Sequence, residues 1–203
     1  MCKGIKICLC LSACVAAVAP LVIPAIALGG PEGLLAEDQG IRQRAQENIL
    51  ARRTNDIFEL VEIIKDPKNE QKIDVVKRAI FCLGELRAVE ATNALIDRLI
   101  YPYDKPILDE WTIGHNARAE TRSVEEWYPA AAALIKIGRP CLPSVLAKVS
   151  QTDDGTEIAV CSHILNTLCK KEELVLLVQK AAAAEVDLKR KERLQRFAGR
   201  LML

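Results

Sequence analysis

The sequence predicts an all-α fold, a short right-handed α-solenoid of about four helix pairs with one insertion. Aromatic residues make up only 4% of the 203 residues, while 50% are hydrophobic and 27% are charged. That composition is typical of packed amphipathic helices rather than of a β-rich sandwich. Two further observations carry the prediction: apolar residues recur at helical spacing, and the resulting helix-pair pattern itself recurs along the chain.

The N-terminus has the features of an export signal. Residues 1–6 are short and basic, residues 7–28 are almost wholly apolar, and Ala25-Ile26-Ala27 offers the small side chains that signal peptidase requires. We therefore predict a signal peptide at 1–27 and a periplasmic or extracellular location. Two alternatives stay open, namely a lipid on Cys14 and retention of residues 7–28 as a membrane anchor.

Regular structure is expected after a flexible leading segment at 28–40, which is rich in glycine. The clearest helix covers 73–86, where Ile73, Val76, Ile80 and Leu83 share one face. A second apolar helix is predicted directly after it, at 88–100. Together they form one helix pair.

This pair recurs along the chain. Leu83-Gly84 has a counterpart in Ile137-Gly138 and weaker ones in Leu50-Ala51 and Leu168-Cys169. Second helices are predicted after these four points, at 57–64, 88–100, 142–149 and 174–178. Since Gly138 follows Gly84 by 54 residues, about twenty more than one repeat needs, we place an insertion at 101–123. Gly84 and Gly138 are expected to occupy equivalent turns between helices. The missing side chain of Gly84 either lets a neighbouring helix approach closely or permits the chain to turn.

Two segments resemble a known family. The sequence AIFCLGEL at 79–86 resembles the first helix of a HEAT repeat, and GRPCLPSVL at 138–146 resembles the turn and second helix of one. The resemblance covers 41–184 and implies a domain of HEAT-like, PBS-lyase-type helical repeats. The chain departs from the family where an arginine commonly follows a valine, because it has Val76, Ala130 and Cys161 there. The usual polar ladder between repeats is therefore not expected.

The C-terminal segment 185–203 is predicted to be a capping helix. Leu194, Phe197 and Leu201 fall on one side, and six basic residues between Lys189 and Arg200 fall elsewhere. Such a helix covers the apolar end of the last repeat and presents a polar face to water.

The cysteines that follow the leading segment are Cys82, Cys141, Cys161 and Cys169. They lack the CxxC spacing of zinc sites, and each is interpreted first as a small buried apolar residue. A disulfide after export stays open.

Catalytic equipment is not visible in the sequence. The two histidines, His115 and His163, stand in no ligand-spaced motif, and no Gly-rich phosphate loop, GxSxG or HExxH occurs. We therefore expect no enzyme activity, no catalytic metal and no cofactor. Net charge is +1 without a basic patch interleaved with aromatics, which disfavours nucleic acid.

Aromatic side chains are concentrated in and beside the predicted insertion. In a chain with so few aromatics, this concentration predicts a surface that binds a protein partner. The alternative is a satellite core that holds a long loop against the helices. The candidate partner-binding residues are Tyr101, Tyr103, Trp111, His115, Arg118, Trp127 and Tyr128.

The sequence thus favours an exported HEAT-repeat protein that acts as a protein-interaction scaffold. Two alternatives remain. One is a phycobilin-lyase-like or other ligand-handling HEAT protein. The other is a membrane-attached lipoprotein adaptor, held through its N-terminal segment or through the basic C-terminal helix on anionic headgroups. The first alternative rests on the resemblance alone, since no lyase-specific residue is present.

Overall fold

The computed structural model describes residues 30–52, 56–101 and 124–202. Within these ranges the chain forms ten α-helices and four short 3-10 helices, and no strand. The predicted all-α class is confirmed. The predicted signal peptide at 1–27 and residues 102–123 of the predicted insertion lie outside the described residues.

Within each described range, the helices follow one another with short connections. The N-terminal part contains η1 (Pro31–Leu35), α1 (Gln39–Arg52), α2 (Ile57–Lys65), η2 (Pro67–Asn69), α3 (Ile73–Glu85), η3 (Val89–Ala91) and α4 (Thr92–Asp97). The C-terminal part contains α6 (Val124–Trp127), α7 (Pro129–Ile137), η4 (Arg139–Cys141), α8 (Leu142–Gln151), α9 (Gly155–Leu168), α10 (Lys171–Ala184) and α11 (Leu188–Met202).

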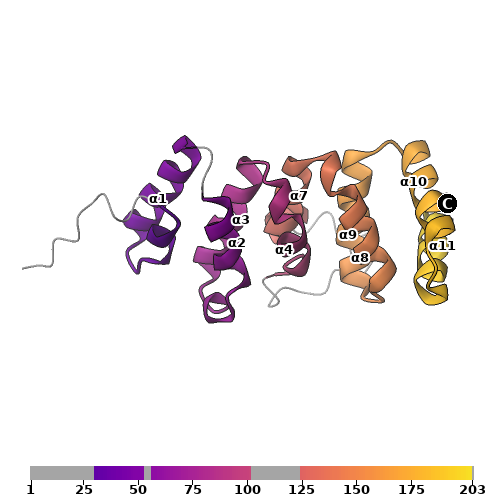
Figure 1. Cartoon of the computed structure of the whole chain (residues 1–203), viewed down its shortest axis with the longest axis horizontal. Helices are drawn as coiled ribbons and strands as arrows, with labels where there is room; N and C mark the ends of the chain where they lie inside the picture. Colours follow the sequence, from indigo (N-terminus) through magenta and orange to yellow (C-terminus); the bar gives the residue numbers. More distant parts are fainter. Residues whose placement is uncertain (1–29, 53–55, 102–123, 203) are drawn as a thin grey trace, which may run out of the picture.

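The helices are arranged along the long axis of the molecule in chain order (Figure 1). Successive contacts join α1 to α3, α3 to α7 and α7 to α9, and a second series joins α2 to α4, α4 to α8 and α8 to α11. One apolar core runs through both series, from Leu34 near the N-terminal end to Phe197 near the C-terminal end. The part of the chain before residue 102 and the part after residue 123 therefore share one core.

Helices α3 and α7, one from each side of residues 102–123, pack closely against each other. Gly84 lies inside α3, and a Cβ atom placed on it would be 2.8 Å from the Cα of Ala133 and 3.0 Å from its Cβ. Real Cβ atoms do not approach backbone this closely. The absent side chain thus allows the two helices to pack at this distance.

The predicted equivalence of Gly84 and Gly138 is wrong. Gly138 ends α7 with φ +85°, a left-handed conformation that favours glycine. The corresponding turn after α3 comes three residues beyond Gly84, where Arg87 has φ 51° and donates its backbone N–H to the carbonyl oxygen of Gly84. Gly84 therefore permits close packing, and Gly138 permits the turn.

The predicted second helix at 88–100 is shorter than expected. It begins with the 3-10 turn η3, and α4 ends at Asp97. Arg98 leaves the helical conformation, and its Nε donates to the carbonyl oxygen of Ile64, 2.8 Å away in the preceding pair. The helix thus ends before its apolar pattern does, and Arg98 at its end contacts another helix pair.

Polar side chains also join the first helices of successive pairs. Asp74 of α3 accepts hydrogen bonds from Arg42 of α1 at 2.8 Å and from Arg78 of its own helix at 3.0 Å. Burial raises the pKa of Asp74, but the hydrogen bonds and positive charges of Arg78 and Arg42 outweigh it and lower the pKa overall. A polar link between α1 and α3 therefore exists here, through residues other than Val76, Ala130 and Cys161.

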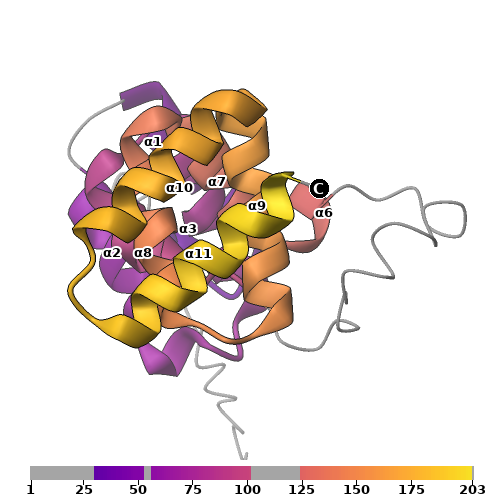
Figure 2. The same cartoon turned by 90° about the vertical axis from the view of Figure 1, so that its right-hand side faces the viewer.

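The C-terminal end is covered by α11, which lies across the end of the molecule beside α10 (Figure 2). Leu194, Phe197 and Ala198 are buried, and α11 packs against α8 and α10. Among the helices of the described ranges, no single one is long and apolar enough to cross a membrane, while α7 and α8 pass that test only as a pair bent by 111°.

Candidate functional site

Two of the aromatic residues predicted to bind a partner are buried. The exposed fraction is 2% for Tyr101 and 3% for Tyr128. The hydroxyl of Tyr101 donates to the carbonyl oxygen of Glu70 at 2.8 Å, and the Arg98 guanidinium lies 5.5 Å from its ring centre. Partner binding is therefore the wrong interpretation for these two side chains, because they belong to the core and present no docking surface.

The other aromatic candidates have mixed outcomes. Trp127 is half-buried and packs against the core from α6. Tyr103, Trp111, His115 and Arg118 lie outside the described residues, so their assignment stays a prediction. The second histidine, His163 of α9, has its Nε2 atom 2.8 Å from the Oε1 atom of Glu125, which ties α9 to α6.

The four cysteines of the helical body are buried free thiols, as predicted. Burial raises the pKa of Cys82 and of Cys161 to about 12 and that of Cys141 to about 11. The thiol of Cys141 also donates to the carbonyl oxygen of Leu134 at 3.5 Å. Protonated, enclosed thiols are poor nucleophiles, so these residues serve packing.

The thiol of Cys161 should make stability depend on alkaline pH. Its folded pKa of about 12 exceeds the unfolded value of about 8.5, so the unfolded chain loses the proton first. The stabilisation is complete below the unfolded pKa and is lost as pH rises toward the folded pKa. We expect the stability advantage of the wild type over Cys161→Ala, measured by urea unfolding, to shrink between pH 8 and pH 10. A stability difference that does not change with pH would contradict the role assigned to the Cys161 thiol.

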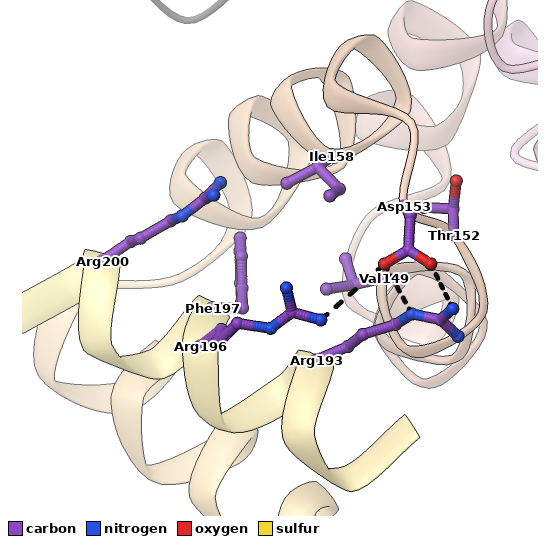
Figure 3. Close-up of a pocket in the computed structure, with 8 residues that line it drawn as sticks. All are labelled: Val149, Thr152, Asp153, Ile158, Arg193, Arg196, Phe197 and Arg200. Carbon is purple, nitrogen blue, oxygen red and sulfur yellow. Dashed lines mark hydrogen bonds and ion pairs between the residues drawn. The ribbon is translucent and has the colours of Figure 1, made fainter. Parts of the chain in front are cut away.

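A rigid loop between α8 and α9 directs one carboxylate toward α11. The hydroxyl oxygen of Thr152 accepts the backbone N–H of Asp154 at 3.0 Å. The side chain of Asp154 in turn accepts the backbone N–H of Glu157 at 2.9 Å and caps α9. With both neighbours held, Asp153 points at the arginines of α11 (Figure 3).

Three arginines of α11 stand at helical spacing on the side that faces α9. They are Arg193, Arg196 and Arg200, and Phe197 between them is buried. The Nε atom of Arg193 donates to Oδ1 of Asp153 at 2.8 Å, and its Nη2 atom donates to Oδ2. The Nη2 atom of Arg196 lies 3.8 Å from Oδ1 of the same carboxylate. The hydrogen bond from Arg193, with the nearby positive charges, lowers the pKa of Asp153, which therefore stays ionised at neutral pH.

These side chains border two adjoining hollows. The first, of about 100 Å³, lies between Asp153, Arg193, Arg196 and Arg200 over an apolar floor of Val149, Ile158 and Phe197. The second, of about 320 Å³, continues past Phe197 and Arg200 toward Ser162, Asn166 and Lys171. The two share Ile158, Phe197 and Arg200, and we call them together the arginine groove.

No family model, no curated protein and no solved structure matches this chain. The resemblance to HEAT repeats therefore stays a prediction from the two sequence segments at 79–86 and 138–146.

The chemistry of the arginine groove is that of an anion-binding surface. Its lining holds four basic side chains and one acidic side chain, set over an aromatic and aliphatic floor. Arginine forks match carboxylates in bidentate geometry. Within the described ranges, no three side chains of His, Cys, Asp or Glu are placed to hold a metal ion.

Only the arginine side of this groove could be recognised in the sequence. The arginines of α11 beside Phe197 are visible at three- and four-residue spacing, but the sequence interpretation assigned them to the solvated face of a cap. Asp153 lies 40 residues before Arg193, and only the fold brings the two together.

Proposed function

We propose that the protein is a non-catalytic interaction scaffold, whose HEAT-like helix pairs form a short right-handed α-solenoid and whose arginine groove takes an acidic segment of a protein partner. The solenoid assignment is supported by the two series of contacts that join successive helix pairs. Export through residues 1–27 is part of the proposal and would place the groove in the periplasm or outside the cell.

The observation that carries the proposal is the excess of arginine over an apolar floor. The side chain of Arg196 is 67% exposed, and Asp153 is the one carboxylate in the lining of the groove. The lining thus has an excess positive charge that attracts further acidic groups. Phe197, Ile158 and Val149 below it offer contact to apolar side chains.

The dimensions of the groove suit a short extended peptide. Arg193 and Arg200 are seven residues apart on α11, which corresponds to about 10 Å along the helix. An extended peptide covers that length with about three residues. The first hollow, of about 100 Å³, is smaller than the usual site for a small-molecule ligand and accommodates one side chain.

A second candidate function is ligand handling, which one further hollow favours. Between α8, α10 and α11 lies a largely apolar space of about 350 Å³, bordered by residues that include Leu142, Leu146, Leu177 and Leu194. That volume is within the usual range for small-molecule sites. A stoichiometric small molecule in the native mass spectrum of the purified protein would favour this candidate over the scaffold.

We expect a fluorescein-labelled peptide of alternating Glu and Leu to bind the protein in low salt, as measured by fluorescence anisotropy. Arg196→Glu should weaken binding about ten-fold or more, since it replaces an attraction by a repulsion next to the peptide carboxylates. Raising the salt to 0.5 M should weaken binding as well.

The matched control is Lys191→Glu, the same charge reversal on the same helix. Five residues separate positions 191 and 196, so their side chains point about 140° apart around the helix axis. This variant should bind the peptide with an affinity within about two-fold of wild type, since only the weak long-range attraction between protein and peptide charges is changed. Equal losses in the two variants would show non-specific charge attraction. Equal binding of a peptide with Gln in place of Glu would show that the protein recognises no carboxylate. Either result would contradict the groove.

A further inference from the structure

The arginine groove already holds one carboxylate, that of the protein itself. Asp153 receives two hydrogen bonds from the fork of Arg193, the geometry in which arginine binds a carboxylate ligand. Arg196 approaches the same group at 3.8 Å. The contact joins the α8–α9 loop to α11, and the side chains of both Asp153 and Arg193 border the first hollow.

The two sides of this contact differ in how firmly they are held. The Nη1 atom of Arg193 also donates to the carbonyl oxygen of Ser150 at 3.2 Å, and its side chain is 22% exposed. The side chain of Asp153 is 63% exposed, and its recorded partners are arginines of α11. Arg193 therefore keeps its place without Asp153, whereas Asp153 can turn into water at little cost.

We propose that Asp153 is a built-in competitor, which occupies the fork of Arg193 until a carboxylate of the bound partner segment replaces it. This inference rests on the proposed function of the groove and specifies its ligand as a carboxylate that Arg193 binds in a bidentate manner. The exchange conserves the number of hydrogen bonds to Arg193, so the internal carboxylate lowers the affinity of the groove without closing it.

The adjacent residue provides a close control. Asp153→Asn and Asp154→Asn each remove one negative charge, one position apart. Asparagine is as good an N-cap as aspartate, so Asp154→Asn preserves the hydrogen bond to the backbone N–H of Glu157. Asp154 does not face Arg193, and only Asp153→Asn therefore frees the arginine from a charged internal partner.

The test is the affinity of the alternating Glu–Leu peptide for wild type and both variants at low salt, with a melting curve for each to verify folding. We expect Asp153→Asn to bind about five-fold more tightly and Asp154→Asn to change affinity less than two-fold. Adding Arg193→Lys to Asp153→Asn should abolish the gain, because lysine retains the charge but lacks the fork.

The outcomes separate this inference from the function on which it rests. Suppose wild type binds the peptide but Asp153→Asn gives no gain in affinity, or the same gain as Asp154→Asn. The proposed competition by Asp153 is then disproved, while the proposed function of the groove is unaffected. If neither wild type nor Asp153→Asn binds, the proposed function itself fails. Binding by Asp153→Asn alone would support both.

Discussion

Replacing Gly84 by valine should lower the free energy of unfolding by about 1 to 3 kcal/mol, which is among the largest effects we expect from a single substitution in this chain. The new Cβ would lie 2.8 Å from the Cα of Ala133, an atom of the α7 backbone that cannot rotate away. Helices α3 and α7 would have to separate, and their shared apolar contacts would loosen. Urea unfolding monitored by circular dichroism measures the change.

The control for Gly84→Val is Gly199→Ala in α11. No atom lies within 4 Å of a Cβ placed at Gly199, so the added methyl meets open space. Alanine is also the better helix former, and we expect the variant to gain up to about 1 kcal/mol. A Gly84→Val protein as stable as wild type would show that α3 and α7 are not in close contact.

Replacing Tyr101 by alanine should cost about 3 to 4 kcal/mol of stability, because the ring is 2% exposed and its removal leaves a cavity in the core. Tyr101→Phe retains the ring and loses only the hydrogen bond to the carbonyl oxygen of Glu70, at about 1 kcal/mol. Thermal and urea unfolding of the two variants provide the measurement.

The same pair of variants decides the role of this residue. Had Tyr101 been a docking side chain, as the sequence suggested, Tyr101→Ala would weaken partner capture while its unfolding curve matched that of wild type. Such a curve would contradict the core position of the ring.

The helices themselves were predictable because their signal is local. The apolar spacing at 73–86 and 57–64 predicted α3 and α2 to within a residue. Apolar residues at three- and four-residue intervals produce a face that must be buried, whatever it packs against. Gly84 and Gly138 could not be distinguished in this way, since a glycine that permits close packing and one that permits a turn look alike in sequence.

The groove was less predictable because its parts are distant in the chain. Periodicity identified the arginines of α11 but not their partner, since Asp153 reaches Arg193 only after α8, α9 and α11 have packed. For the aromatic residues, the sequence predicted a site that the structure does not contain at the two described tyrosines. Their concentration near the insertion predicted a surface, yet Tyr101 and Tyr128 are in the core, where large rings gain most from burial.

The most direct test of the central claim is amide hydrogen exchange of the full chain with and without the alternating Glu–Leu peptide. We expect slower exchange in the α8–α9 loop, the first turns of α9 and the part of α11 around Arg193 and Arg196, and no change in α1 to α3. Protection confined to residues 101–128 would contradict the groove and instead favour the aromatic segment as the docking surface.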